Sequence, residues 1–504
     1  MKMSSKSYPI IVGAAQFKQE RNVSQPLDPL SLMAKTCQMA IDDTTTGEIK
    51  EYIDTLFMTN INSWSYKDAP GELSKILGIN PSKKVYFQAM GNLPQKLVNR
   101  AARAISSGES QAILITGGEA AYSSYRAKRG KISLNWPKDR KPEYIEGKWG
   151  GSLSTEFEKK YRLFAPTCLY ALFETALRAA SGRNLEEHRI YMGKLFEYFS
   201  KIASKNPYAW NKKSYTSDEI TIPSAENRNV NYPYTKLMCA NMFVDQSASL
   251  IMTSEEIAEK LKIDRNLWIY LMGSADLQNV HYVTQRQELH TSPAAREGSK
   301  LALEQAGLTI DKIDLFDIYS CFPSMVQIIM NELNLSENDP RDLTITGGLP
   351  YFGGPMSSYS IHAIVTAVSL IRKNPSLKIM VIANGGYNTK QSFGIYGTDP
   401  PAKLWDECDG AVIQESIFAE ALPEPAEEAN GQLTIEAFTI YYERDGKPLR
   451  GFALGHLEDG RRTLAFIEER GDALVNMEQK EFVGKIFPVH FDSVKGRNFV
   501  SIKE

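Results

Sequence analysis

Cysteine is scarce in this 504-residue sequence, and no two cysteines form a CxxC pair. An odd number of scattered cysteines supports neither a disulfide framework nor a thiolate metal site. We therefore expect a reducing, cytoplasmic environment and no bound metal. The five cysteines are Cys37, Cys168, Cys239, Cys321 and Cys408.

Excess charge of one sign and long apolar runs are also missing. The formal net charge is −2, whereas binding to a nucleic-acid backbone needs a strong excess of lysine and arginine on one face. No window approaches the ~18 uninterrupted apolar residues that cross a bilayer. We expect neither a nucleic-acid partner nor a membrane span. The hydrophobic content of 42% is that of an ordinary globular protein.

The most informative feature is an internal duplication. Each half has, in order, a helix, a strand-like run, a helix rich in small residues and a buried strand that ends in two glycines. The ranges are 29–42, 51–57, 97–107 and 112–118 in the first half, and 294–307, 310–316, 361–372 and 379–386 in the second. Apolar strands that alternate with helices predict a mostly parallel sheet covered on both faces. Ligands bind such sheets at the carboxyl ends of the strands, so the paired glycines mark the expected active-site edge.

A long segment, from about Tyr122 to Asn241, separates these two units and carries predicted helices over 168–180 and 185–204. Its front holds a basic cluster. Such a cluster either meets the phosphates of a nucleotide-like ligand or is a solvated loop. The cluster consists of Arg126, Lys128, Arg129, Lys131, Lys138, Arg140 and Lys141.

A polar, proline-containing linker over 422–428 ends the α/β pattern. Beyond it, the alternation in 433–442 and the Asp-Gly turns that follow predict hairpins, which a small antiparallel β-barrel would close. The expected domains are 1–265, with an inserted loop domain over about 122–241, then 266–417, and a C-terminal barrel over 432–504.

The order of halves, insertion and glycine turns resembles the thiolase superfamily, in particular the sterol-carrier-protein-type, thiolase-like proteins of type 1 with an additional C-terminal β domain. The similarity covers about residues 8–415 and includes the runs 203–209, 245–251 and 281–286. It implies an α/β thiolase fold of two fused βαβαβαββ-type halves. It also implies a coenzyme A thioester as ligand or substrate, and no permanently bound cofactor.

The residues that carry out thiolase chemistry are altered at the positions that the resemblance assigns to them. The nucleophilic cysteine of a thiolase, at the start of a helix, falls at Gly91. The activating histidine falls at Gly354, and the proton-shuttling cysteine at Ala383. The residue that orders an oxyanion-hole water falls at Tyr319. We therefore expect ordinary thiolase activity to be absent.

Cys321 is the one thiol expected beside this pocket. With Tyr319 it is the candidate for a relocated catalytic group, and an inert buried thiol is the alternative. His362 lies in an apolar run and is interpreted as a core histidine. The expected ligand-binding residues are Gly353, Gly354, Asn384, Gly385 and Gly386.

Three functions stay open at this point. The leading hypothesis is an acetyl-CoA acetyltransferase-like protein of lipid metabolism that binds acyl-CoA thioesters without thiolase chemistry. The alternatives are an acyltransferase or hydrolase with rebuilt machinery at Cys321, Tyr319 or Asn384, and a subunit whose C-terminal domain docks a partner enzyme. A monomer and a homodimer are both compatible, and thiolases generally pair through the strand that lies here near 85–88.

Overall fold

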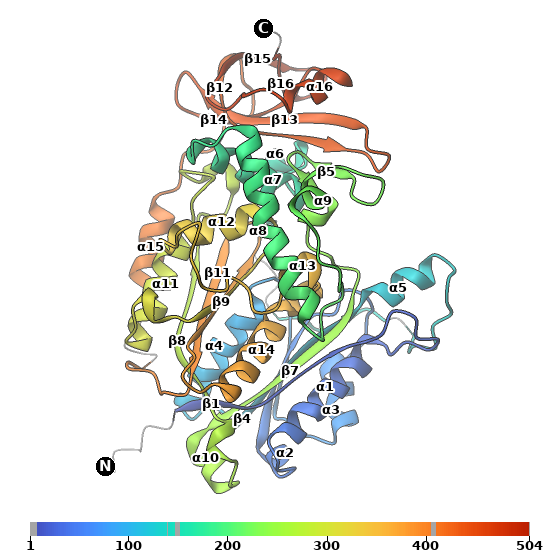
Figure 1. The fold of residues 1–504 in the computed structure, drawn as a ribbon, viewed down its shortest axis with the longest axis vertical. Coiled ribbons are helices and arrows are strands. Elements are labelled where there is room, and N and C mark those ends of the chain that lie inside the picture. Colours follow the sequence, from blue (N-terminus) through green and yellow to red (C-terminus); the bar gives the residue numbers. More distant parts are fainter. Residues whose placement is uncertain (1–7, 139, 147–151, 405–409, 503–504) are drawn as a thin grey trace.

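The computed structural model describes residues 8–138, 140–146, 152–404 and 410–502 (Figure 1), so Cys408 and the last two residues of the predicted barrel lie outside the described residues. A nine-stranded sheet has the order β3-β2-β4-β7-β1-β8-β11-β10-β9. Its strands are β1 (Pro9–Lys18), β2 (Ile53–Thr59), β3 (Lys83–Phe87), β4 (Ala112–Ala120), β7 (Asp245–Ser254), β8 (Ile269–Gln278), β9 (Leu315–Ile318), β10 (Ile379–Gly385) and β11 (Lys390–Gly397).

Four strands of each half follow the same order, which confirms the predicted duplication, and β3 is an additional edge strand of the first half. From the middle outward, the first half reads β1-β7-β4-β2-β3 and the second β8-β11-β10-β9. In each half the last strand along the chain lies beside the first. Strands β1 and β8 pair with each other through Ile10–Tyr270 and Ile11–Ile269, which joins the halves into one sheet.

The sheet is mixed, so the expectation of a mostly parallel sheet was wrong. Only the β2–β3, β2–β4 and β9–β10 pairs are parallel. Residues 386–389 alone connect β10 to β11, and so short a connection permits only an antiparallel pair. Strand β7 likewise runs antiparallel to both of its neighbours.

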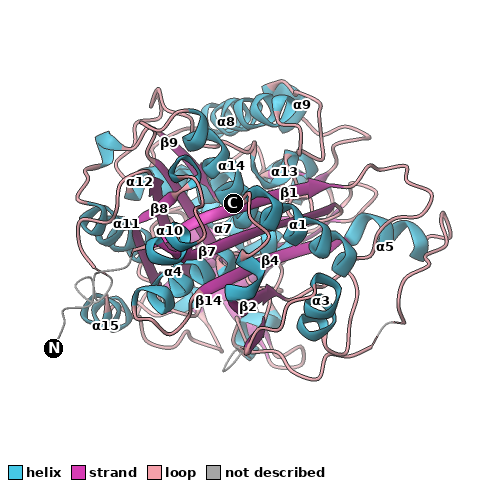
Figure 2. Ribbon diagram, turned by 90° about the horizontal axis from the view of Figure 1, so that it is seen from below, coloured by secondary structure: helices cyan, strands magenta, loops and turns pink. Residues whose placement is uncertain are grey.

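Helices surround the strands (Figure 2). Asp28 caps α1 by accepting from the backbone N–H of Leu30, and a proline follows at the first helical position. Ser292 caps α11 in the same way, and this helix ends at Gly307 with φ of +64°. The apolar faces of α4 and α14 share one core with strands from both halves. The principal helices of the two halves are α1 (Pro29–Asp43), α4 (Leu93–Ser106), α11 (Pro293–Ala306) and α14 (Tyr359–Lys373).

The inserted segment contains the two predicted helices as α7 (Pro166–Ala180) and α8 (Leu185–Lys205). No helix in the described part of the chain combines the length and the apolar content needed to span a bilayer. The other α-helices are α2 (Ile49–Tyr52), α3 (Ala69–Leu77), α5 (Ala121–Lys128), α6 (Glu156–Lys160), α9 (Ser217–Thr221), α10 (Glu255–Lys260), α12 (Pro323–Glu332), α13 (Gly348–Tyr351), α15 (Ala411–Ala419) and α16 (Asp472–Met477). Short 3-10 helices are η1 (Lys236–Met238), η2 (Arg265–Leu267), η3 (Val283–Gln285), η4 (Ile310–Lys312) and η5 (Met356–Ser358).

The C-terminal strands gather at the end of the molecule opposite α2 and α10 (Figure 1). Their pairings form a ring, β12-β13-β14-β16-β15, which returns to β12. A ring of five strands cannot alternate in direction throughout, and β14 and β16 are its parallel pair. The wholly antiparallel arrangement was therefore wrong, and the closed barrel stays a prediction. The strands are β12 (Gly431–Tyr442), β13 (Pro448–Leu457), β14 (Arg462–Ile467), β15 (Ile486–Asp492) and β16 (Arg497–Val500), and β5 (Asn229–Asn231) and β6 (Tyr234–Thr235) of the insertion extend the sheet.

The chain itself covers the outer edge of β3. The backbone N–H of Glu146 donates to the carbonyl oxygen of Tyr86 at 2.7 Å, and that of Gln88 donates to the carbonyl oxygen of Glu146 at 2.9 Å. The Glu146 carboxylate is held by Arg100 at 2.7 Å. Edge groups that are already paired cannot template a second strand, so this segment occupies the strand edge expected to mediate dimerisation.

Candidate functional site

The start of α4 meets the carboxyl ends of β9 and β10, which brings together three of the predicted site positions. A Cβ added at Gly91 would lie 2.5 Å from the hydroxyl oxygen of Tyr319 and closer still to the carbonyl oxygen of Asn384. Dispersion contacts between heavy atoms are optimal only at about 3.5–4.0 Å. The space that any side chain at position 91 would need is therefore already filled by the Asn384 carbonyl and the Tyr319 phenol.

Packing fixes Tyr319 in this place. Its backbone N–H donates to the carbonyl oxygen of Ile382 at 3.1 Å, and its ring meets that of Tyr359 edge-on with centroids 5.5 Å apart. The side chain is only 7% exposed. Burial and the nearby Cys321 raise the pKa of the Tyr319 phenol well above its ordinary value, so this hydroxyl is neutral at physiological pH.

Cys321 lies beside this cluster, between β9 and α12, and is 8% exposed. Its sulfur is 3.9 Å from Nδ2 of Asn384. Burial raises the pKa of the Cys321 thiol to about 12, against smaller opposing effects of hydrogen bonds. Because the thiolate is the nucleophilic form, the structure gives Cys321 the predicted location but not the activation.

Tyr170 of α7 is a site residue that the sequence did not reveal. Its hydroxyl oxygen accepts from Nδ2 of Asn384 at 2.7 Å and from the backbone N–H of Asn388 at 3.1 Å. Its ring stacks on Phe322, with centroids 4.7 Å apart. Two convergent N–H donors are the kind of arrangement that stabilises an oxyanion. Here both donors are already hydrogen-bonded to the hydroxyl oxygen of Tyr170. Tyr170 stands in an apolar helical run with no motif around it.

The Asn384 side chain is held from both ends. Its Nδ2 donates to Tyr170, and its Oδ1 accepts from Nε2 of Gln391 at 3.1 Å. Nε2 of Gln391 also donates to Oδ1 of Asn388 at 2.7 Å. A Cβ added at the neighbouring Gly385 would lie 2.6 Å from Oδ1 of Asn92. The end of β10 is therefore pressed against the start of α4, and Asn384 has a single defined orientation there.

The other predicted positions lie in different surroundings. A Cβ added at Gly354 would face Leu349 and the carbonyl oxygen of Asn241 at 3.3 and 3.6 Å, whereas Tyr319 and Asn384 are the groups nearest Gly91. Gly353 has φ of +118°, a left-handed conformation that favours glycine. Ala383 is fully buried, and Gly386 also has positive φ, +64°.

His362 is a core histidine, as predicted. It is fully buried, and its Nδ1 lies 2.9 Å from Oε1 of Gln16. Burial lowers the pKa of its imidazole from 6.5 to about 3, so the ring is neutral at physiological pH.

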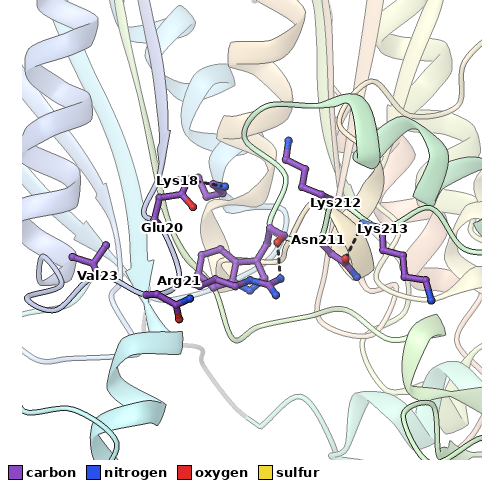
Figure 3. A pocket seen from close by; sticks show the side chains of 9 residues that line it. Lys18, Glu20, Arg21, Val23, Asn211, Lys212 and Lys213 are labelled. Atoms are coloured by element: carbon purple, nitrogen blue, oxygen red, sulfur yellow. Dashed lines mark hydrogen bonds and ion pairs between the residues drawn. The ribbon is translucent and has the colours of Figure 1, made fainter.

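The basic cluster of the insertion is largely exposed, and its first member, Arg126, reaches the rim of a pocket of about 600 Å³ by donating to the carbonyl oxygen of Arg21. In Figure 3, Lys212 and Lys213 extend in different directions. Lys18 is engaged by Glu20 at 3.1 Å. The lysines of the pocket do not converge on one point, and the exposure of the cluster itself favours a solvated basic surface. The pocket is lined by Lys18, Glu20, Arg21, Asn22, Val23, Trp210, Asn211, Lys212 and Lys213.

Comparison with known proteins extends the likeness over the whole chain. A family model described as the additional C-terminal domain of thiolase-like protein type 1 matches residues 412–494. A solved structure of a monomeric SCP2-thiolase-like protein type 1 from Mycobacterium smegmatis is 30% identical, with a TM-score of 0.84 and 99% of both chains covered.

Two further proteins are more distant. The solved Ltp2–ChsH2(DUF35) aldolase is 17% identical, with a TM-score of 0.58, and covers 77% of this chain and 97% of its own, which shows the fold alone. A probable acetyl-CoA acetyltransferase from Dictyostelium discoideum is 28% identical over 148 residues, or 29% of this chain. The match spans about a third of that relative's length.

Proposed function

The chain belongs to the SCP2-thiolase-like proteins of type 1 within the thiolase superfamily, and on that basis we propose that it binds an acyl thioester of coenzyme A without forming an acyl-cysteine intermediate. Thiolases and acetyl-CoA acetyltransferases are the relatives from which this ligand class comes. The loss of the covalent step rests on the geometry around Gly91.

The observation that carries the proposal is the filled space at the start of α4. Covalent acyl transfer needs a nucleophile with free approach to the carbonyl carbon. At Gly91 the nucleophile is missing, and the hydroxyl of Tyr319 stands where its side chain would be. Restoring the chemistry would therefore require two changes at once.

A rebuilt acyltransferase is the less favoured function. Cys321 would have to attack as a thiolate, and burial holds the pKa of this thiol near 12, so only a minute fraction is ionised at neutral pH. Among the described residues, the side chains that most affect the pKa of this thiol are the uncharged Tyr170 and Asn384. Cys321 fits the packing of the cluster better than it fits nucleophilic catalysis.

Intact-protein mass spectrometry combined with calorimetry tests this function. Acetyl-CoA and acetoacetyl-CoA should each give saturable heat on titration into the full chain, and neither should leave an acyl group on the protein. The matched controls are Cys321→Ala and Cys168→Ala, the latter removing another buried thiol with a raised pKa. An acyl adduct that disappears only in Cys321→Ala would establish a relocated nucleophile, and absence of heat with both thioesters would overturn ligand binding.

A docking role for the C-terminal domain is the second candidate. The distant aldolase structure is, by its name, a complex of two components, and the C-terminal domain of this chain presents large apolar side chains to solvent, with Val494 96% and Ile486 61% exposed. A partner that co-purifies with the full chain and is lost from the Ile486→Ser/Val494→Ser double variant would support docking. Unchanged co-purification would remove these side chains from the interface.

A further inference from the structure

A second pocket, of about 370 Å³, lies where the inserted helices meet the C-terminal domain; we call it the interdomain pocket. Residues of α7 and α8 line one side of it and Glu478 and Gln479, which follow α16, line another, so both parts of the chain build it. In Figure 1, α7 lies just below the C-terminal strands. Its lining comprises Glu174, Thr175, Arg178, Leu185, Glu186, His188, Arg189, Met192, Thr221, Pro223, Asn229, Tyr232, Pro233, Glu478 and Gln479.

The deepest polar group is a buried carboxylate. Glu174 is 0% exposed and His188 is 2% exposed. Oε1 of Glu174 lies 2.7 Å from Nε2 of His188 and accepts from Nε2 of Gln327 at 2.6 Å, while Oε2 accepts from the Tyr234 hydroxyl at 2.6 Å. Each of these three partners can donate a hydrogen bond, so the chain itself satisfies both oxygens of Glu174.

The two arginines of the lining are engaged by carboxylates of other residues. Arg178 pairs with Glu481. Arg189 pairs with Glu186 at 2.6 Å and with Asp218 at 3.3 Å. Each guanidinium is therefore matched by a carboxylate other than Glu174 or Glu478.

Glu478 contributes an acceptor without a donor. Its Oε1 is buried and has no hydrogen-bond partner among the described residues. Burial raises the pKa of this carboxyl from 4.5 to about 7. An acceptor that is buried without a partner is unfavourable, so a ligand with an N–H donor would supply the hydrogen bond that the chain does not.

An aromatic side chain stands beside this acceptor. One face of the Tyr232 ring stacks on Phe438, with centroids 5.4 Å apart, and the tyrosine hydroxyl donates to the carbonyl oxygen of Glu478. The ring also lines the pocket. Aromatic faces attract cations, and among the described residues no group of histidine, cysteine, aspartate and glutamate side chains is arranged to hold a metal ion. These features favour an organic cation over a metal.

We propose that the interdomain pocket binds a small organic ammonium ion, whose N–H groups donate to Glu478 and whose carbon skeleton lies against Tyr232. Leu185 and Met192 provide further apolar lining for that skeleton. The pocket shares no residue with the cluster around Tyr319, so the two sites can be probed with different ligands. The C-terminal domain supplies Glu478, which gives this domain a direct part in ligand recognition.

Calorimetry on the full chain at pH 8 tests the proposal with three probes of nearly equal shape: 2-phenylethylammonium, 2-phenylethanol and phenylacetate. The ammonium probe should bind saturably, and the alcohol and the carboxylate at least tenfold more weakly. Glu478→Gln should weaken the ammonium probe at least tenfold, and Tyr232→Leu should weaken it as well. Glu458→Gln, at an exposed position of the same domain, should leave its affinity unchanged.

Three results would overturn the proposal. They are no saturable binding of the ammonium probe to the native chain, equal binding of the alcohol, and unchanged affinity in a Glu478→Gln protein whose circular dichroism matches the native one. Should Glu478→Gln fail to fold, the probe series on the native chain still decides, because charge selectivity is read there without any substitution. Acetyl-CoA titrated into the same preparations reports the other site separately.

Discussion

The starts of α4 and α14 are equivalent places in the two halves, and the chain fills them differently. At α4, Gly91 faces the Tyr319 hydroxyl, whereas at α14 the Ser358 hydroxyl lies 3.2 Å from that of Thr59. A Cβ added at Gly117 on the neighbouring strand would lie 2.5 Å from Oγ of Ser358. Both helix starts therefore approach strand ends closely, one through a bulky ring and one through two small hydroxyls. The difference indicates that duplication kept the backbone approach while the side chains between helix and strand diverged.

Of the changes at the two helix starts, Tyr319→Ala should have the largest effect on stability. Removing a buried aromatic side chain leaves a cavity, and we expect a loss of about 3–5 kcal/mol in the free energy of unfolding. Chemical denaturation measures it, with Tyr144→Ala as the control, since Tyr144 is 63% exposed. A loss no greater than in the control would mean that the ring is not what fills the space at Gly91.

Gly91→Cys comes next, because overpacking a filled site costs about 1–3 kcal/mol. The cost should fall when the same change is made in the Tyr319→Ala background, since the two side chains compete for one volume. A double-mutant cycle on denaturation free energies measures the coupling. Additive effects would show that position 91 and the tyrosine ring do not compete.

Lowering the pH should reduce the stability of the α14 side of the molecule through His362. His362 is neutral in the folded chain with a pKa of about 3, against 6.5 in the reference state. Because its pKa is lower in the folded chain, the histidine of the unfolded chain takes up a proton first as the pH falls. The contribution of neutral His362 to the free energy of unfolding is therefore fully present above pH 6.5 and is lost as the pH falls toward 3.

His362→Gln should therefore lose less stability than the native chain between pH 7 and pH 5. We expect a difference of about 2 kcal/mol, from 1.36 kcal/mol for each pH unit below 6.5. Denaturation curves of both proteins at the two pH values give the comparison. Equal losses in the two proteins would exclude His362 as the source of the acid sensitivity.

Thr59→Val is the mildest change, because it keeps the shape and removes one hydrogen bond to Ser358. The expected loss is about 1 kcal/mol in the free energy of unfolding. Thr398→Val is the matched control, because it removes a hydrogen bond to the carbonyl oxygen of Pro375 at an exposed position, where water can replace it. A loss as large as that of Tyr319→Ala would mean that the two helix starts are equally dependent on what fills them.

The candidate site was only partly predictable. Motif alignment placed Gly91, Tyr319 and Asn384 at one site, and the fold does bring these three together. It could not reveal Tyr170, because the hydrogen bond from Asn384 joins residues 214 positions apart. Nor could it indicate that the pKa of the Cys321 thiol is raised, since that depends on burial by the whole fold.

The sequence by itself determined the local elements and their repetition. Periodic apolar residues, the Asp28–Pro29 and Ser292–Pro293 helix starts and the paired glycines act over a few residues, so they can be read without the fold. Only the tertiary structure decided how these elements meet: the parallel pair in the five-stranded ring, the covering of β3 by Glu146, and the unpaired Glu478 in the interdomain pocket. Each depends on contacts between distant parts of the chain, and local preferences carry no information about which distant groups will face one another.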